Sequence, residues 1–173
     1  MTVDRTIVEA YAATYRGLHP AAVSNVDAAG EAEVSVPPEL IAAQRNLARR
    51  RRVGETLVEV FDADDPGGFG PALQIVTDQA TMLMDSVTVL LHRLGVAYVA
   101  LMHPALRVRR DAEGSLLDVR VGDDPGPDGS GSDDSGPAEI DESWIHVQLS
   151  ESVSRRALAE AVRLLPMVVS DAR

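Results

Sequence analysis

The chain has 173 residues, of which 45% are hydrophobic and 25% charged, and its formal charge is −11. These values fit one folded domain with an ordinary core and some additional chain, and they exclude a collagen-like, disulfide-scaffold or wholly disordered protein. The chain has no cysteine, which excludes disulfides, thiolate metal sites and a thiol nucleophile.

The negative charge is concentrated in one acidic tract, residues 122–142. This tract holds eight acidic residues and no arginine, which leaves 19 acidic against 16 basic residues in the rest of the chain. Lysine is absent, so Lys-based Schiff-base and Walker-type chemistry are excluded. The net acidity disfavours binding to nucleic acid or anionic lipid. Because neither a membrane-length apolar run nor a signal-peptide pattern occurs, we expect a cytoplasmic protein.

Residues 1–54 are predicted to form a helical N-terminal extension with a connector. Apolar residues at helical spacing predict a helix over 2–16, and the Ala-, Ser-, Asp- and Gly-rich stretch 19–37 is typical of a connector. A second helix is expected to open at Pro37-Pro38 and run into Arg45 and the arginine run at 49–52. That run has two interpretations, a nucleic-acid or partner-binding patch or a solvated helix end, and we favour the second.

Residues 55–173 show a compact α+β pattern, with the acidic tract 122–142 expected to be a mobile loop. We expect helix N-caps at Thr81 and at Ser150 or Ser152, and a bend or restart at Pro166. Strand 144–149 alternates as a half-buried strand would, with Trp144, His146 and Gln148 on one face. The predicted elements are strands 56–61 and 73–77, helix 82–94, strand 96–102, hairpin 106–110 with 115–121, strand 144–149 and a final helix through 169.

The order of these elements predicts a ferredoxin-like antiparallel sheet in which two amphipathic helices cover one face. The other face is then expected to be free for a protein partner. Met84 and Val89 also lie away from the main apolar stripe of helix 82–94. A second apolar surface on a small domain favours self-association or docking within a larger chain over an isolated monomer.

The sequence contains no complete motif for catalysis, metal binding or cofactor binding. Gly68 and Gly70 open a G-x-G-x-x-G pattern, but Leu73 stands where the third glycine belongs. Asp62 and Asp64 begin a Ca²⁺-loop pattern that Pro66 interrupts. We therefore expect no catalytic, cofactor-binding or metal site here.

The four histidines lack metal-ligand spacing, although His103 and His146 could meet on neighbouring strands. A small enzyme that uses these two histidines and an aspartate is the hypothesis from a different functional class. We favour hydrogen-bonded or exposed histidines, because local spacing arranges no pair of titrating groups for acid–base work.

The junction between strand 73–77 and helix 82–94 is the part of the sequence that most resembles a ligand site. Free N–H groups at a helix start attract carboxylates, although every such junction shares this property. A small anionic effector is therefore one possibility, and a purely structural turn is the default. The residues concerned are Asp78, Gln79, Ala80, Thr81, Met82, Leu83 and Met84.

Longer stretches of the sequence resemble a known family. Five stretches resemble the N-terminal segment of the large NAD-specific glutamate dehydrogenases of actinobacterial type. They are the opening helix 7–17, residues 61–74, residues 82–95, Glu142-Ser-Trp-Ile-His-Val-Gln-Leu149 and residues 159–166. The resemblance covers 2–17 and 55–173, interrupted by the acidic tract.

The resemblance implies an ACT-like domain within a much longer chain. It implies a parent enzyme, a cytoplasmic homo-oligomer, that oxidises L-glutamate to 2-oxoglutarate and ammonia while reducing NAD⁺. This fragment is then a non-catalytic regulatory or oligomerisation module, which contacts other domains or further copies. The alternative is an amino-acid sensor at Asp78–Met84. Similar chains carry Gly-Gly before Met-Leu-Met-Asp, whereas Ala80 and Thr81 stand here, and their Cβ atoms would obstruct close ligand approach. We therefore favour the assembly or regulatory role over a ligand site.

Overall fold

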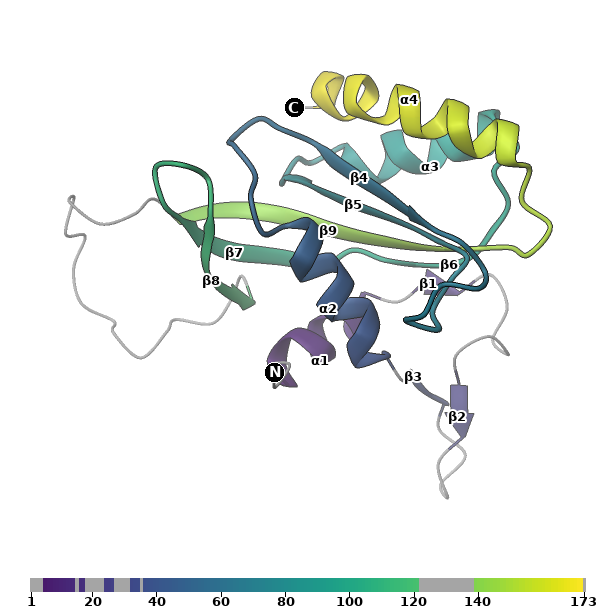
Figure 1. Cartoon of the computed structure of the whole chain (residues 1–173), viewed down its shortest axis with the longest axis horizontal. Coiled ribbons are helices and arrows are strands. Elements are labelled where there is room, and N and C mark those ends of the chain that lie inside the picture. The colour runs from purple at the N-terminus through teal and green to yellow at the C-terminus, as the bar shows by residue number, and fades with distance from the viewer. Residues whose placement is uncertain are drawn as a thin grey trace.

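The computed structural model describes residues 5–14, 16–17, 24–26, 32–34, 36–121 and 139–172. Its centre is a seven-stranded antiparallel sheet with helices on both faces (Figure 1). The main path through the sheet runs β1-β6-β9-β5-β4, and β7 pairs with both β8 and β9. The strands are β1 (Arg16–Gly17), β4 (Leu57–Phe61), β5 (Ala72–Asp78), β6 (Tyr98–Met102), β7 (Ala105–Arg110), β8 (Leu116–Val121) and β9 (Glu139–Leu149).

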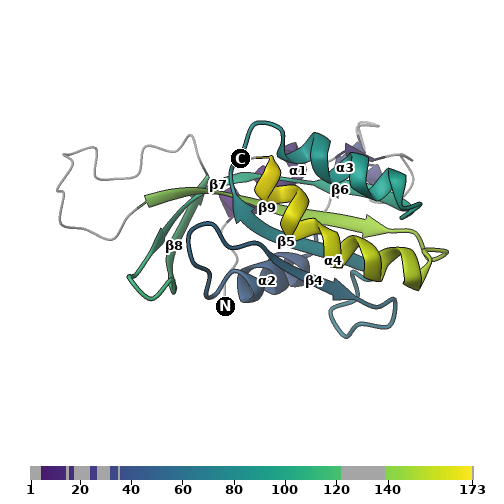
Figure 2. The ribbon, with the colours of Figure 1, turned by 90° about the horizontal axis from the view of Figure 1, so that it is seen from above.

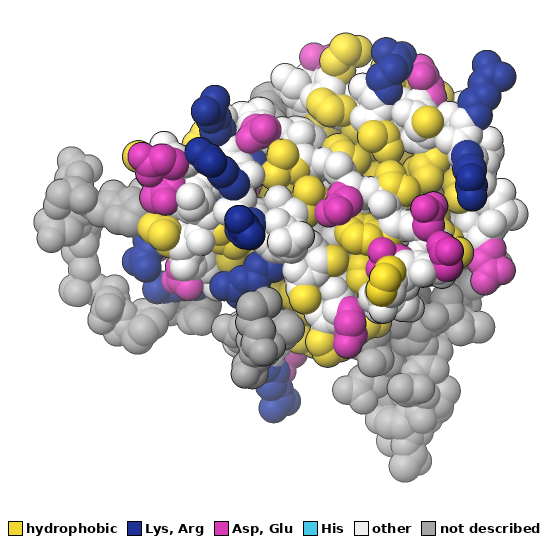
Figure 3. All heavy atoms as spheres, viewed as in Figure 1, with side chains coloured by type: hydrophobic (Ala, Val, Ile, Leu, Met, Phe, Trp, Pro, Cys, Tyr) yellow, Lys and Arg dark blue, Asp and Glu magenta, His cyan; other side chains and the backbone are white. Residues whose placement is uncertain are grey.

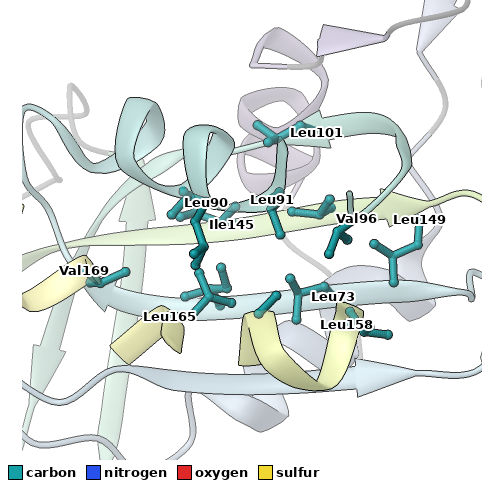
Figure 4. Packing of buried hydrophobic residues seen from close by; sticks show 14 of the residues in the cluster. Leu73, Leu90, Leu91, Val96, Leu101, Ile145, Leu149, Leu158, Leu165 and Val169 are labelled. Carbon is teal, nitrogen blue, oxygen red and sulfur yellow. The ribbon is translucent and has the colours of Figure 1, made fainter. Parts of the chain in front are cut away.

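One face of the sheet carries the two long helices that the apolar spacing predicts. Helices α3 (Leu83–Arg93) and α4 (Arg155–Asp171) lie side by side across it (Figure 2). Aliphatic residues of both helices point toward β5 and β9 and form a hydrophobic core (Figure 4). The predicted stripes are confirmed, since Leu83, Val87 and Leu91 of α3 and Ala161 and Leu165 of α4 are buried. The α+β fold with a preceding N-terminal helix is as expected.

The opposite face is not free, which corrects the expectation of an open surface. Helices α1 (Arg5–Ala13) and α2 (Pro38–Leu47) lie on that side of the sheet (Figure 1). Tyr11 of α1 and Leu40 and Ile41 of α2 join the same buried cluster as Val76 and Trp144. Strand β9 is therefore buried on both faces, and the expectation of a half-buried strand is wrong. The physical reason is that the short N-terminal helices supply apolar residues to this face.

Several element boundaries differ from the sequence prediction. Helix α3 has Met82 at its N-cap position without a side-chain cap bond, so Thr81 is not the cap. The cap of α4 is Ser154, whose hydroxyl accepts from the Ala157 N–H, instead of Ser150 or Ser152. Pro166 lies within α4, and the helix continues to Asp171. The position of the first helical turn decides which serine can reach a free N–H.

The N-terminal connector and the acidic tract contain short paired segments. Within 19–37, β2 (Ser24–Val26) pairs with β3 (Ala32–Val34). Strand β9 begins at Glu139, so residues 139–142 of the acidic tract pair with β5 or β7. Residues 122–138, where we expect a mobile loop, lie outside the described residues. The domain boundary after residue 54 stays a prediction.

Candidate functional site

The predicted effector segment Asp78–Met84 is spread over three environments. Asp78 ends β5, and its Oδ2 accepts from the Gly54 N–H at 2.9 Å. Thr81 and Met82 are exposed, whereas Leu83 is buried in the core beneath α3 and α4. The partly buried members of the segment that pack against that core are Ala80 and Met84. The segment therefore does not converge on one pocket, and its role in effector binding stays a prediction.

Gln79 of this segment lines a cavity. The cavity has a volume of about 430 Å³ and lies between α1, the β5–α3 connection, β7 and the ends of β8 and β9. Its size falls within the range of small-molecule sites, about 300–1,000 Å³. The lining residues are Ala10, Ala13, Thr14, Gln79, Pro104, Ala105, Arg107, Val121 and Asp141.

Two opposite charges stand at this cavity. Arg107 Nε donates to Asp141 Oδ1 at 3.3 Å, and the two side chains are 45% and 58% exposed. Antiparallel pairing of β7 with β9 places these residues directly opposite each other. The side-chain oxygen of Gln79 accepts from the Ser143 hydroxyl, and its backbone N–H donates to the Asp141 carbonyl at 2.9 Å. Gln79 is thereby held beside the charged pair.

A buried charge cluster surrounds Glu142 of β9, the residue that follows Asp141 in the sequence. We call it the Glu142 cluster; it consists of Arg51, Asp78, Arg110, Glu142 and Trp144. Glu142 accepts from Arg51 Nη2 at 2.7 Å, from Arg110 Nε at 2.7 Å and from the Trp144 indole N–H at 3.0 Å. Arg51 and Glu142 are fully buried. Two arginines and two carboxylates balance the charge, as burial requires.

The backbone around the cluster completes its hydrogen bonding. Arg110 Nη1 donates to the carbonyls of Ala48 and Gly114, both at 2.9 Å. The Arg51 N–H also donates to the Gly114 carbonyl. The interpretation of residues 49–52 as a solvated helix end is therefore wrong for Arg51, because α2 ends at Leu47 and the chain turns the guanidinium inward. The alternation of apolar and polar residues along β7 and β9 could have indicated that Arg110 and Glu142 are buried, since each lies on the buried face of its strand.

A second polar group is buried beneath α2. The His146 Nδ1 lies 3.3 Å from the Gln74 amide nitrogen, and its Nε2 lies 3.3 Å from Gln148 Oε1. The neutral Nε2–H tautomer satisfies both contacts, because the Gln74 amide then donates to Nδ1 and the ring donates to Gln148. Burial lowers the pKa of His146 to about 4, while the bond to Gln148 opposes this shift. Gln74 also donates to the Leu40 carbonyl of α2.

His103 and the glycine-rich turn also lie in structural surroundings. His103 lies after β6, and its N–H donates to the Thr14 hydroxyl of α1 at 3.1 Å. Within the described residues, no group of three or more His, Asp or Glu side chains is placed to hold a metal ion. Gly70 sits where a Cβ would meet the Asp62 carbonyl at 1.9 Å, so close backbone packing explains a glycine there.

Comparison with known proteins identifies the family. Residues 39–164 match the family model of the glutamate dehydrogenase ACT1 domain. The chain is 43% identical over 171 residues to the NAD-specific glutamate dehydrogenase of Mycobacterium tuberculosis (strain H37Rv). The match covers 95% of this chain and 10% of that relative, so the chain spans about a tenth of the relative's length. No helix within the described residues is long and apolar enough to cross a membrane. The chain belongs to the ACT1 domain family of glutamate dehydrogenases.

Proposed function

We propose that this chain is a non-catalytic regulatory and assembly domain of a large NAD-dependent glutamate dehydrogenase. The observation that carries the proposal is the alignment of nearly the whole chain with a tenth of an NAD-specific glutamate dehydrogenase, within the ACT1 family. The parent chain would oxidise L-glutamate to 2-oxoglutarate and ammonia with reduction of NAD⁺. NAD would bind elsewhere in that parent, which would work in the cytoplasm as a homo-oligomer.

The state of the buried titratable groups supports a structural role for them. Glu142 is held by two arginines and an indole, and His146 by two glutamines. A general acid or base must reach the proton that it transfers. Side chains that are enclosed and engaged with one another in this way serve the fold.

Exposed hydrophobic side chains on the helical layer support an assembly role. Met82 is 55% exposed, Val89 of α3 50% and Met167 of α4 61%. Hydrophobic side chains also lie among charged ones across the face seen in Figure 3. Apolar residues of this kind become buried when another protein surface covers them. The partner surfaces would belong to other domains or other copies of the parent chain.

Two measurements test this proposal. The purified domain is expected to form no NADH from L-glutamate and NAD⁺, and glutamate-dependent NADH formation would overturn the non-catalytic role. In the full-length parent enzyme, Val89→Asp is expected to shift the oligomer to smaller species in analytical ultracentrifugation. Leu117→Asp on β8 is the matched control, because Leu117 is 48% exposed and lies outside the helical layer. An unchanged oligomer in Val89→Asp, or equal effects of both variants, contradicts assembly through α3.

An effector-sensing form of the regulatory role is the alternative. The observation that favours it is Gln79, which stands in the predicted segment Asp78–Met84 and also lines the cavity described above. Calorimetric titration of the domain with a panel of amino acids separates the alternatives. Heat from at least one of them supports sensing, and no heat from any leaves the assembly role alone.

A further inference from the structure

We propose that the outer surface of the helical layer docks onto the same surface of a second copy of this chain. The helical layer consists of α3, α4 and residues 150–154, which lead into α4. The two copies are related by a two-fold axis that lies in the interface and runs across both helices, so each helix faces its own counterpart in the opposite direction. The inference rests on the assembly form of the proposed function, and it names the partner surface and its orientation.

The two helices of the layer run in opposite directions. Strands β5 and β9 are antiparallel, with Asp78 opposite Glu142 and Ala72 opposite Gln148. Helix α3 follows β5 and α4 follows β9, and the two helices pack side by side on the same face of the sheet (Figure 2). The start of α3 therefore lies at the same end of the layer as the end of α4.

The exposed charges of the layer are separated by sign along its length. One end, where α3 begins and α4 ends, exposes Asp85 and Asp171. The other end, where α3 ends and α4 begins, exposes three arginines and one glutamate, so it is basic. These residues are Arg93, Arg155, Arg156 and Glu151. In the middle of α4, Glu160 and Arg163 pair with each other at 2.6 Å.

The charges of α4 are the reverse of those that its own backbone favours. A helix is stabilised by acidic residues in its first turn and basic residues in its last turn. Helix α3 follows this rule, with Asp85 in its first turn and Arg93 in its last. Helix α4 has no acidic residue in its first turn and no basic residue in its last, where Arg155 and Asp171 stand instead. The reversal gives both helices the same sign at each end of the layer, which is unfavourable in a single copy and favourable against a partner of opposite sign.

The signs select a second copy and one orientation for it. The layer carries as many acidic as basic residues, four of each, whereas the chain as a whole has a formal charge of −11. Among the described residues, no ion pair is made by Asp85, Arg93, Arg155 or Asp171. A two-fold axis across the helices places the acidic end of each copy against the basic end of the other. An axis along the helices would place like charges together.

Exposed apolar side chains lie where this contact would cover them. Val89 is at the middle of α3, and a residue close to a two-fold axis meets its own counterpart. Met82 and Met167 are exposed towards the acidic end of the layer. There they would contact the alkyl stems of the arginines at the basic end of the other copy. The two-fold contact therefore buries the apolar residues and pairs the charges at the same time.

Charge exchange tests the orientation. Sedimentation velocity of the chain is expected to show a reversible dimer with a dissociation constant of about 100 μM or tighter. Asp85→Arg/Asp171→Arg makes both ends basic, and Arg93→Glu/Arg155→Glu makes both ends acidic. Each double variant alone is expected to dimerise at least about tenfold more weakly, because like charges then face each other. An equal mixture of the two is expected to recover the dimer to within about threefold, and native mass spectrometry identifies the mixed dimer by its mass.

A matched control separates this contact from a general effect of net charge. Arg45→Glu/Arg49→Glu changes the charge by the same amount as Arg93→Glu/Arg155→Glu, at exposed positions of α2 and the residues after it, on the other face of the sheet. This control is expected to dimerise as the native chain does. A monomeric native chain, unchanged dimerisation of either layer variant, an equal loss in the control, or a mixture that stays monomeric overturns the proposal.

Cross-linking tests the position of the axis without changing any charge. The chain has no cysteine, so Val89→Cys introduces a single thiol. A short bismaleimide is expected to join two copies of Val89→Cys and to leave Leu117→Cys on β8 monomeric. Equal cross-linking of the two variants, or none in Val89→Cys, overturns the two-fold contact. This outcome is separable from the proposed function, because smaller oligomers of the full-length Val89→Asp parent would keep the assembly role even if the charge-exchanged chains dimerise like the native one.

Discussion

The two faces of the sheet are buried with different chemistry. Beneath α3 and α4 lies a core of aliphatic side chains contributed by both helices and by β5, β6 and β9. Beneath α1 and α2 the buried residues include aromatic rings, the Glu142 cluster and the polar layer around His146. An aliphatic core tolerates rearrangement, whereas buried charges and amides require particular partners. The second face therefore specifies how the N-terminal helices join the sheet.

A substitution in the Glu142 cluster should lower the free energy of unfolding more than any other substitution proposed for the two faces. Glu142→Gln removes the charge that compensates two buried guanidinium groups, and we expect a loss of about 3–5 kcal/mol in the free energy of unfolding. Urea denaturation of the domain measures it. Glu160→Gln is the control, because its ion pair with Arg163 lies on the exposed surface of α4 and should change stability little. Similar stability of both variants would contradict a structural role for the cluster.

The aliphatic face should respond to lost volume instead of lost charge. Leu165 of α4 is fully buried, so Leu165→Ala should lower the free energy of unfolding by about 2–5 kcal/mol. Met167→Ala, two residues along the same helix and exposed, is the matched control and should have a small effect. Thermal unfolding followed by circular dichroism measures both. The comparison fails if the exposed position is as sensitive as the buried one.

The aliphatic face was also the more predictable from the sequence. Apolar spacing locates α3 and α4 and their buried stripes because a helix repeats every 3.6 residues. The short helices α1 and α2 were expected as an extension, but local spacing does not show which sheet face they cover. The prediction for Arg51 was wrong, since a run of arginines near a helix end is usually solvated. Its burial depends on Glu142, which is 91 residues away in the sequence.

The candidate site shows the same limit. Gln79 falls in the predicted segment because a strand-to-helix junction is visible in the sequence. Arg107 and Asp141 were not predicted, because they meet only through the pairing of β7 with β9. The position of Asp141 within the acidic tract also made a place in a strand harder to predict, since its neighbours in sequence are typical of a solvated loop. The residues of this cavity are brought together by long-range strand pairing and not by a local sequence motif.

The polar layer beneath α2 should make stability depend on pH. The folded protein lowers the pKa of His146 to about 4 from 6.5, so the unfolded chain binds more protons between these values. The contribution of the buried, neutral His146 to the free energy of unfolding is therefore complete above about pH 6.5. It falls by about 3 kcal/mol as the pH drops to about 4. Urea denaturation across this range measures the slope. His146→Gln should reduce the slope, and His92→Gln, at an exposed position, should preserve it.

The smallest effect should come from the turn that closes the Glu142 cluster. Gly114 has a φ of +85°, and a Cβ there would meet the Arg51 carbonyl oxygen at 2.5 Å. Gly95 also has a positive φ, of +67°, but a Cβ would meet nothing within 4 Å. Gly95→Ala should lower the free energy of unfolding by about 1 kcal/mol through backbone strain alone. Gly114→Ala should lower it by about 1 kcal/mol more, because the Arg51 backbone must also move. Equal unfolding free energies in urea for the two variants would mean that the Arg51 backbone yields freely, and the cluster would then not fix the path of the chain between α2 and β4.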